Sequence, residues 1–115
     1  MKETNILRLT LITLTKVGRY FRNHVGLIKA ADGTVHKFGL TVGSSDIIGF
    51  TPITINGKRI AVFTAIEVKS ATGKPSKEQD NFIKMVKDNG GIAGIVRSPE
   101  ESLALIGEYL DKVHK

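Results

Sequence analysis

Glu67 and Lys69 stand two positions apart in a β-branched stretch, and of this 115-residue chain they are the residues whose types best suit chemistry. Successive side chains of a strand point to opposite faces, so Glu67 and Lys69 should share one face while Val68 points to the other. Asp46 lies in the preceding apolar segment, which a hairpin turn at Asn56-Gly57 would fold back onto this strand. If those two strands pair, Asp46 can lie beside Glu67.

Two neighbouring carboxylates repel each other unless a cation joins them, and hard oxygen ligands favour Mg²⁺ or Mn²⁺. The backbone carbonyl of Val68 could add a further oxygen ligand. Such a metal polarises a phosphoryl oxygen, and Lys69 could orient the attacking water or stabilise the developing negative charge. The pattern therefore predicts a metal site for phosphodiester hydrolysis built on Asp46, Glu67 and Lys69. The alternative is an ordinary Glu–Lys pair on an exposed strand face.

The elements that must position these residues begin with a helix over residues 2–16, where apolar residues partly fit a helical stripe. That stripe comprises Ile6, Leu7, Leu9, Leu11, Ile12 and Leu14. A meander of strands is predicted next, because short β-branched or aromatic runs alternate with turns such as Asp32-Gly33. The predicted strands cover residues 19–21, 26–29, 35–38, 46–50 and 59–69.

The C-terminal third has clear helix signals. Ser76 and Gln79 have the spacing of a capping box at the start of a helix that Asn89-Gly90-Gly91 ends. Residues 92–96 form a predicted strand, and Ser98 caps a last helix with Glu101 as its box partner. The order α, β meander, α, β, α predicts one α/β domain over residues 1–115, with a mixed sheet flanked by helices.

The charge balance of the chain points to a polyanionic partner. Lys and Arg outnumber Asp and Glu by 17 to 11, giving a formal charge of +6, so nucleic acid is the first candidate and improved solubility the alternative. The absence of cysteine excludes disulfides and thiolate chemistry. No segment has the length of a membrane span or the form of a signal peptide, so we expect a cytoplasmic protein without a membrane partner.

Four motifs together resemble the VRR-NUC nucleases of the PD-(D/E)xK superfamily, which have a restriction-endonuclease-like core. They are Gly43-Ser44-Ser45-Asp46-Ile47-Ile48-Gly49, Ile66-Glu67-Val68-Lys69, Ser76-x-x-Gln79 and Val96-Arg97-Ser98. The resemblance implies that Asp46, Glu67, Lys69 and Gln79 are catalytic. The family arginine matches Arg97, although Ile95-Val96-Arg97 replaces a Val-Arg-Arg run, and Ser45 replaces the proline of the superfamily name.

The resemblance also implies a metal-dependent, structure-specific DNA endonuclease using Mg²⁺ or Mn²⁺. Compact members of the family are stand-alone proteins, often phage-encoded, that act as dimers on branched DNA such as Holliday (four-way) junctions. Here the first or the last helix could supply a dimer interface. Two other readings remain open: a non-catalytic basic nucleic-acid-binding module, and a sequence-specific nuclease like a restriction enzyme.

Several assignments have a structural alternative. Gln79 could reach the active site or act only as the capping partner of Ser76. Glu3 matches a position where the family often has an additional metal-side glutamate, but acidic residues are also common near helix N-termini. Four basic residues near the site in sequence could bind DNA phosphates or could simply be solvated: Arg22, Lys74, Lys77 and Arg97.

Overall fold

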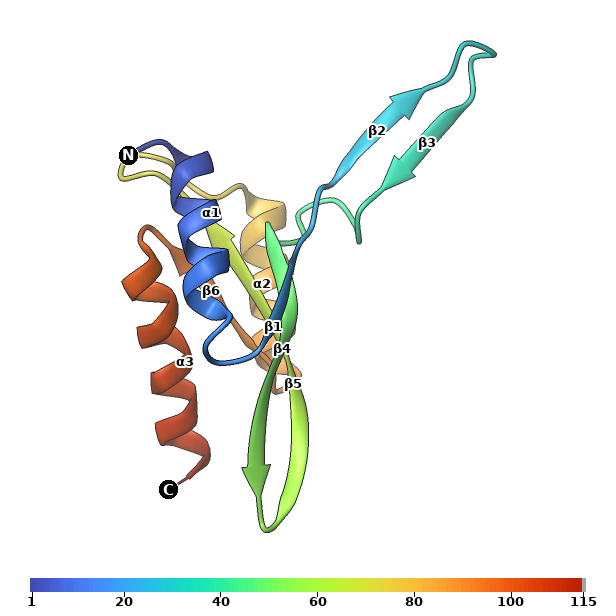
Figure 1. The fold of residues 1–115 in the computed structure, drawn as a ribbon. Coiled ribbons are helices and arrows are strands. Elements are labelled where there is room, and N and C mark those ends of the chain that lie inside the picture. Colours follow the sequence, from blue (N-terminus) through green and yellow to red (C-terminus); the bar gives the residue numbers. More distant parts are fainter. Residues whose placement is uncertain (115) are drawn as a thin grey trace.

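A four-stranded mixed sheet forms the body of the computed structural model, which describes residues 1–114 (Figure 1). Its strand order is β1-β4-β5-β6, with β5–β6 parallel and the other two pairs antiparallel. These strands are β1 (Arg19–Arg22), β4 (Ile47–Ile55), β5 (Lys58–Val68) and β6 (Ile92–Val96). The three helices are α1 (Glu3–Leu14), α2 (Lys77–Asp88) and α3 (Pro99–Val113). The predicted α/β class and its flanked mixed sheet are confirmed.

The hairpin β4–β5 carries most of the sheet. Its turn residues Asn56 and Gly57 have φ values of 51° and 79°, the conformation that an Asn-Gly hairpin turn requires. The register pairs Ile47 with Ile66, and β6 then pairs with the C-terminal half of β5. This half of β5 is therefore a central strand, and it is buried from Thr64 to its end.

Helices cover the two faces of the sheet unequally. α1 and α3 lie side by side on one face, over a large apolar core that includes Leu7, Ile66 and Ile106. α2 covers the other face with a smaller cluster built on Phe82 and Val86. Residues Ala65 and Ile66 belong to these different clusters, as the strand alternation requires. The face of β5 that carries Ala65 and Glu67 is therefore the one beneath α2.

The expected single sheet needs one correction. β2 (Gly26–Lys29) and β3 (Val35–Phe38) pair only with each other in the described chain, as a separate two-stranded sheet. These strands and their turn, residues 26–38, project from the body and are called the arm (Figure 1). The radius of gyration of 15.3 Å exceeds the roughly 13 Å of a compact domain of this length, as a projecting arm requires.

The helix boundaries and faces also depart from prediction in detail. α1 buries Ile6, Leu7, Thr10 and Leu14, whereas Leu9 and Ile12, which the apolar pattern included in the stripe, are exposed. Ser98 caps α3 as predicted. The Glu101 carboxylate, however, accepts from the amide of Arg97 and not from the amide of Ser98 that a capping box would use. No helix among residues 1–114 is both long and apolar enough to cross a bilayer.

Candidate active site

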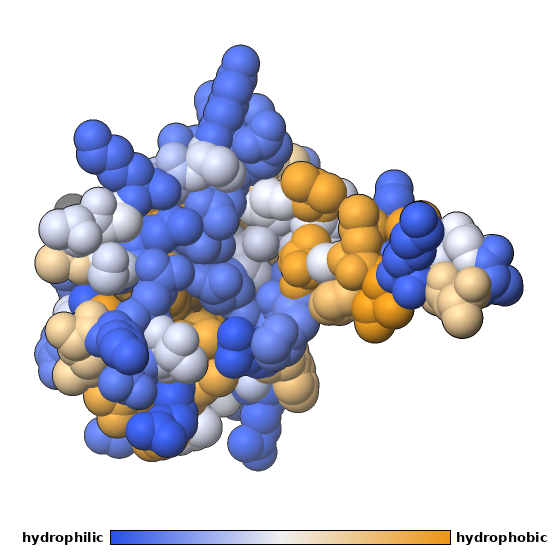
Figure 2. All heavy atoms as spheres, turned by 90° about the horizontal axis from the view of Figure 1, so that it is seen from above, coloured by the Kyte–Doolittle hydropathy of each residue, from blue (hydrophilic) through white to orange (hydrophobic). Residues whose placement is uncertain are grey.

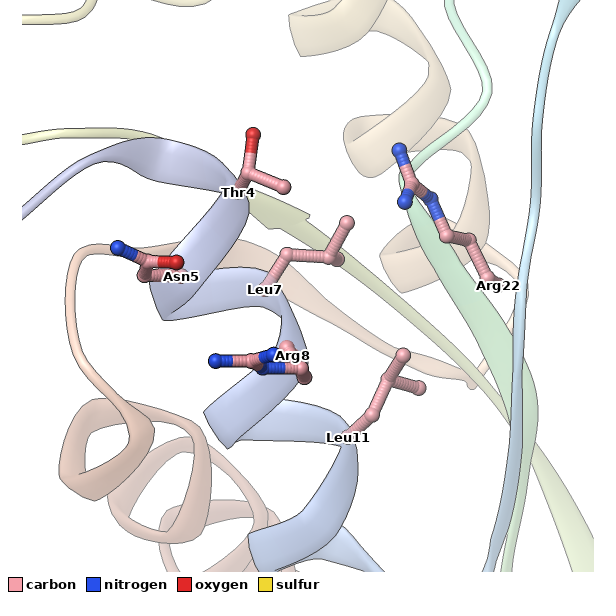
Figure 3. A pocket seen from close by; sticks show the side chains of 6 residues that line it. All are labelled: Thr4, Asn5, Leu7, Arg8, Leu11 and Arg22. Atoms are coloured by element: carbon pink, nitrogen blue, oxygen red, sulfur yellow. The ribbon is translucent and has the colours of Figure 1, made fainter.

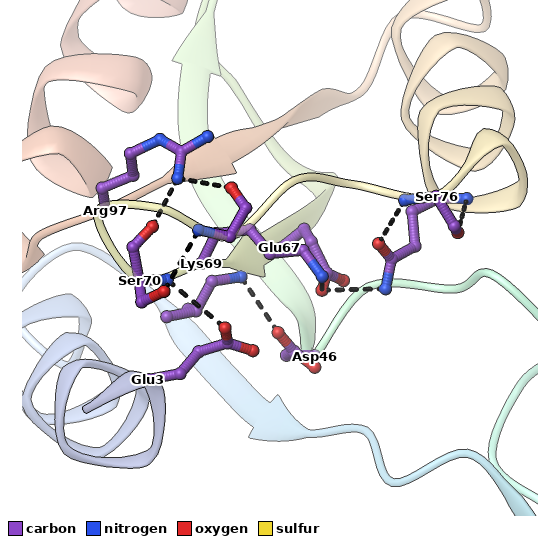
Figure 4. Close-up of polar contacts among 10 residues, drawn as sticks. Glu3, Asp46, Glu67, Lys69, Ser70, Ser76 and Arg97 are labelled. Atoms are coloured by element: carbon purple, nitrogen blue, oxygen red, sulfur yellow. Dashed lines mark hydrogen bonds and ion pairs between the residues drawn. The ribbon is translucent and has the colours of Figure 1, made fainter.

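Glu67 is a buried carboxylate in the central strand β5, beneath the first turn of α2 (Figure 4). Only 2% of its surface is exposed, so the alternative of an exposed surface ion pair is wrong. Its Oε2 accepts from Gln79 Nε2 at 3.1 Å and lies 3.4 Å from Lys69 Nζ. Its Oε1 is buried and has no hydrogen-bond partner within the described residues. A buried oxygen without a partner is costly unless a ligand satisfies it.

Asp46 immediately precedes β4 and lies across the end of β5. The Val68 amide donates to Asp46 Oδ2 at 3.0 Å, so this carboxylate bonds the backbone directly after Glu67. The pairing of Ile47 with Ile66 had already aligned the two acidic residues, and the predicted neighbourhood of Asp46 and Glu67 is confirmed.

The electrostatics of the site follow from that proximity. Burial, and then the negative charge of Asp46, raise the pKa of Glu67 from 4.5 to about 8, against the opposing effect of the Lys69 ammonium. Without a cation, Glu67 therefore stays protonated at pH values well above those at which a carboxyl group usually ionises. A cation between the two carboxylates would favour the ionised form of both.

The donor set fits a hard divalent cation. Asp46 and Glu67 offer carboxylate oxygens, Glu67 Oε1 has no partner, and Val68 contributes a backbone carbonyl. Within residues 1–114, no cluster of three or more acidic or histidine side chains could hold a metal. A bound ion would therefore take its other ligands from the backbone and from water, which suits Mg²⁺ because it usually retains several waters.

Gln79 performs both roles that the sequence left open. Its Oε1 accepts from the Ser76 amide at 2.9 Å, which completes the capping box at the start of α2. Its Nε2 donates to Glu67. The helix cap therefore fixes the amide whose other end holds the buried carboxylate.

Glu3 and Arg97 fasten the segment that leaves β5. Glu3 is exposed, and its Oε2 accepts from the Ser70 amide at 3.3 Å. Arg97 Nη1 donates to the carbonyls of Ser70 and Gly73, the latter at 2.7 Å (Figure 4). Both side chains thus meet the backbone just beyond Lys69. This use of Arg97 was not predicted, because the sequence does not show which loop a long side chain will reach.

A family model described as the VRR-NUC domain matches residues 26–100, which is most of the chain. The matched range contains the buried pair Asp46 and Glu67, together with Lys69, Gln79 and Arg97. The chain belongs to the VRR-NUC family. No curated protein matches it. Membership makes this a nuclease-family domain with a restriction-endonuclease-like fold, and DNA is the substrate that the family implies.

The VRR-NUC match begins at β2, so α1 and β1 lie outside it. The family match therefore does not bear on the roles predicted for Glu3 and Arg22. Arg22 lines a pocket of about 210 Å³ between β1 and α1, opposite Leu7 and Leu11 (Figure 3). The predicted phosphate contact of Arg22 stays a prediction.

Lys74 lies on the loop that joins β5 to α2, and Lys77 is the first residue of α2. Both side chains are exposed. Neither forms an ion pair within the described part of the chain. Their positions leave both ammonium groups accessible to a polyanion, and their contacts with DNA phosphates stay a prediction.

Two polar residues that support the site were missed from the sequence. Ser70 supplies the amide and carbonyl that Glu3 and Arg97 hold, and Asn23 donates its backbone amide to the Asp46 carbonyl at 2.7 Å. An isolated asparagine or serine is too common to single out. The only available signal was the position of Asn23 between two predicted strands, where a polar residue usually marks a turn.

Proposed function

We propose that this protein is a divalent-metal-dependent endonuclease that hydrolyses phosphodiester bonds of DNA. The observation that carries the proposal is the buried pair Asp46 and Glu67 with Lys69 beside it, in which Glu67 Oε1 lacks a partner among residues 1–114. Asp46, Glu67 and the Val68 carbonyl would hold Mg²⁺ or Mn²⁺. Glu3 is a further candidate metal ligand, because its bond from the Ser70 amide places its carboxylate beside the segment that follows Lys69.

The metal would activate a water and polarise the scissile phosphate. The protein side chains then have distinct tasks. Gln79 holds the Glu67 carboxylate in one orientation, because its own amide is fixed by the cap of α2. Lys69, with 13% of its side chain exposed, is placed between the buried carboxylate and solvent. Its ammonium can stabilise the negative charge that develops on the phosphate in the transition state.

The carboxylates provide the test of this function. A labelled four-way junction, a flap and a linear duplex would be incubated with Mg²⁺ or Mn²⁺, with and without EDTA. Asp46→Ala and Glu67→Ala should each abolish cleavage while the protein stays folded and still binds DNA. Asp111→Ala, which removes an exposed acidic charge from α3, is the matched control and should cut normally. Cleavage in EDTA, or cleavage by both active-site variants, would refute the proposal.

A branched substrate and a homodimer complete the proposal, because two active sites related by a two-fold axis suit a nearly symmetric junction. The same panel of substrates tests this preference. Faster cutting of one linear sequence would favour a sequence-specific nuclease instead. Binding of all substrates without products would favour the non-catalytic module, for which the net charge of +6 is sufficient.

The exposed apolar surface of the arm supports the proposal that the partner is a second copy of this chain. Cross-strand pairs place Ile28, His36 and Phe38 on one face, and Leu27, Lys29, Val35 and Lys37 on the other. Figure 2 shows apolar side chains gathered along the arm and at its base. There Leu40 borders an apolar groove of about 360 Å³ with Phe63 and Met85. Exposed apolar surface of this kind marks interaction sites.

Two matched substitutions test the arm as the dimer interface. Ile28 and Val35 are 59% and 57% exposed, and they point to opposite faces. Ile28→Asp, on the face that also carries Phe38, should convert a dimer into a monomer in sedimentation at micromolar concentration. Val35→Asp, on the face that carries Lys29 and Lys37, should remain dimeric. A monomeric wild-type chain that still cuts junctions would remove the dimer from the proposal.

A further inference from the structure

Asn23 joins the base of the arm to the segment that leads into Asp46. It lies between β1 and the arm and is 9% exposed. Its Nδ2 donates to Ser44 Oγ at 2.8 Å and to the Ser45 carbonyl at 2.9 Å, and its Oδ1 accepts from the Leu40 amide at 3.2 Å. One side chain thus holds both ends of residues 40–45.

The backbone of Asn23 continues the same connection. The β1–β4 pairing ends at Arg22 and Ile47, and the next bond runs from the Asn23 amide to the Asp46 carbonyl. Beyond this point the two strands separate, one entering the arm and the other coming from the loop. The amide side chain of Asn23 therefore supplies the bonds that regular sheet pairing would have supplied.

The loop that Asn23 holds is irregular, and its internal hydrogen bonds join Ser44 to Thr41. It contains no helix or strand between Phe38 and Ile47, and Gly43 has a φ of 85°. A Cβ at Gly43 would lie 2.6 Å from the Glu78 carbonyl oxygen, so the loop passes directly against the first turn of α2. Ser44 and Ser45 are buried, and Asn23 bonds both of them.

Loss of the Asn23 side chain would leave Asp46 with weaker constraints. The carboxylate would keep its bond from the Val68 amide. The Ser45 carbonyl would lose its bond from Asn23, and Ser44 Oγ would keep only its bonds with Thr41. A buried polar group that loses its partner costs free energy, and the loop would shift to recover one. Displacement of the Asp46 carboxylate alters the ligand set directly, because ligand orientation depends on such supporting bonds.

We propose that Asn23 is a positioning residue of the nuclease site, which acts through residues 40–45 to fix the Asp46 carboxylate for metal binding. This inference rests on the proposed function. Asn23 does not touch the DNA or the metal in this scheme. Its loss should therefore weaken metal binding and turnover while leaving the affinity for DNA almost unchanged.

Three single variants and one double variant test the proposal. Asn23→Ala removes the three side-chain bonds, and Ser44→Ala removes the acceptor of one of them together with the bonds between Ser44 Oγ and Thr41. Ser102→Ala is the control, because Ser102 is also buried but donates to the Pro99 carbonyl within α3, away from the site. Each variant would be compared with wild type in thermal melting, in Mn²⁺ binding without DNA by electron paramagnetic resonance, and in junction cleavage.

Asn23→Ala should weaken Mn²⁺ binding and lower kcat by about 10-fold or more, with the KM for DNA changed less than about twofold. Ser44→Ala should change both quantities in the same direction, and the losses of the two single variants should not add in full in the double variant, because both remove the bond between Asn23 and Ser44. Ser102→Ala should melt at a lower temperature yet bind Mn²⁺ and cut as wild type does.

Wild-type Mn²⁺ binding and kcat in Asn23→Ala would overturn the inference and reduce Asn23 to a stabilising residue. If Asn23→Ala does not fold, unchanged Mn²⁺ binding by Ser44→Ala overturns it instead. Failure of the proposed function gives a different result, since the unsubstituted chain would then neither bind Mn²⁺ nor cut DNA. That result would refute both proposals together.

Discussion

The chain contains two β-hairpins built from the same local signals, yet one forms the centre of the sheet and the other projects from the body. Both have an Xaa-Gly turn with positive φ at the glycine, Gly57 in β4–β5 and Gly33 in the arm. The strands of β4–β5 are flanked by β1 and β6 and covered by helices. The comparison shows that a hairpin signal specifies local pairing, while burial depends on which elements flank the hairpin.

A pair of lysines, one directly after β5 and one in the arm, should give the largest difference. Lys69→Gln removes the ammonium beside Glu67 and should lower the cleavage rate about 1000-fold, which corresponds to about 4 kcal/mol of transition-state stabilisation. Lys37→Gln in the exposed arm should leave kcat unchanged and weaken only salt-sensitive DNA binding. Single-turnover cleavage at two salt concentrations would measure both. An equal loss of kcat in the two variants would contradict a chemical role for Lys69.

A matched pair of isoleucines separates the hairpins by stability. Ile66 in β5 is fully buried, so Ile66→Ala should cost about 3 kcal/mol of unfolding free energy. Ile28 in the arm is 59% exposed, and Ile28→Ala should change that free energy by less than about 0.5 kcal/mol. Urea unfolding at a concentration where the chain is monomeric would measure both. A similar cost for Ile28→Ala would show that the arm packs on its own body.

The acidic residues of the two hairpins should differ in how much they make stability depend on pH above 4.5. The folded chain raises the pKa of Glu67 from 4.5 to about 8, so it keeps a proton that the unfolded chain releases. Without metal, the melting temperature should therefore fall by a few degrees as the pH rises from below 4.5 through 8. Glu67→Gln should remove this slope. Hydrogen bonds from Thr34 lower the pKa of Asp32 in the arm turn, so Asp32→Asn should leave the slope between these pH values intact.

The turn glycines give the smallest expected difference. An added Cβ meets no atom within 4 Å at either Gly33 or Gly57, so each substitution reports backbone strain alone. Gly57→Ala should lower the unfolding free energy by about 1 kcal/mol, because β4–β5 unfolds with the body. Gly33→Ala should only speed amide exchange within the arm and leave the melting temperature unchanged. Equal melting shifts would mean that the arm and the body unfold as one unit.

The sequence was sufficient wherever a local pattern decides the structure. The Asn56-Gly57 turn, the alternation along β5 and the Ser76 cap were all predicted, and together they bring Asp46, Glu67, Lys69 and Gln79 to one place. The chemical core of the site could be predicted because two strands joined by a tight turn have almost no freedom in register.

The sequence was insufficient where pairing is non-local. Nothing in the β2 and β3 segments shows that β1 pairs with β4 and leaves them outside the sheet. The same limit applies to Arg97 and Asn23, whose partners lie at least 17 residues away in the chain. Their roles depend on the path of loops, which short-range periodicity does not encode.

The closed base of the arm has a consequence for how this fold can vary. Because Asn23 ties the entering chain to the leaving chain, residues 26–38 behave as an insertion whose two ends are already fixed together. The entropic cost of a longer or shorter insertion at such a point grows only slowly with its length. The arm can therefore be shortened, extended or exchanged for another hairpin as a module, while Asp46 and Glu67 keep their geometry.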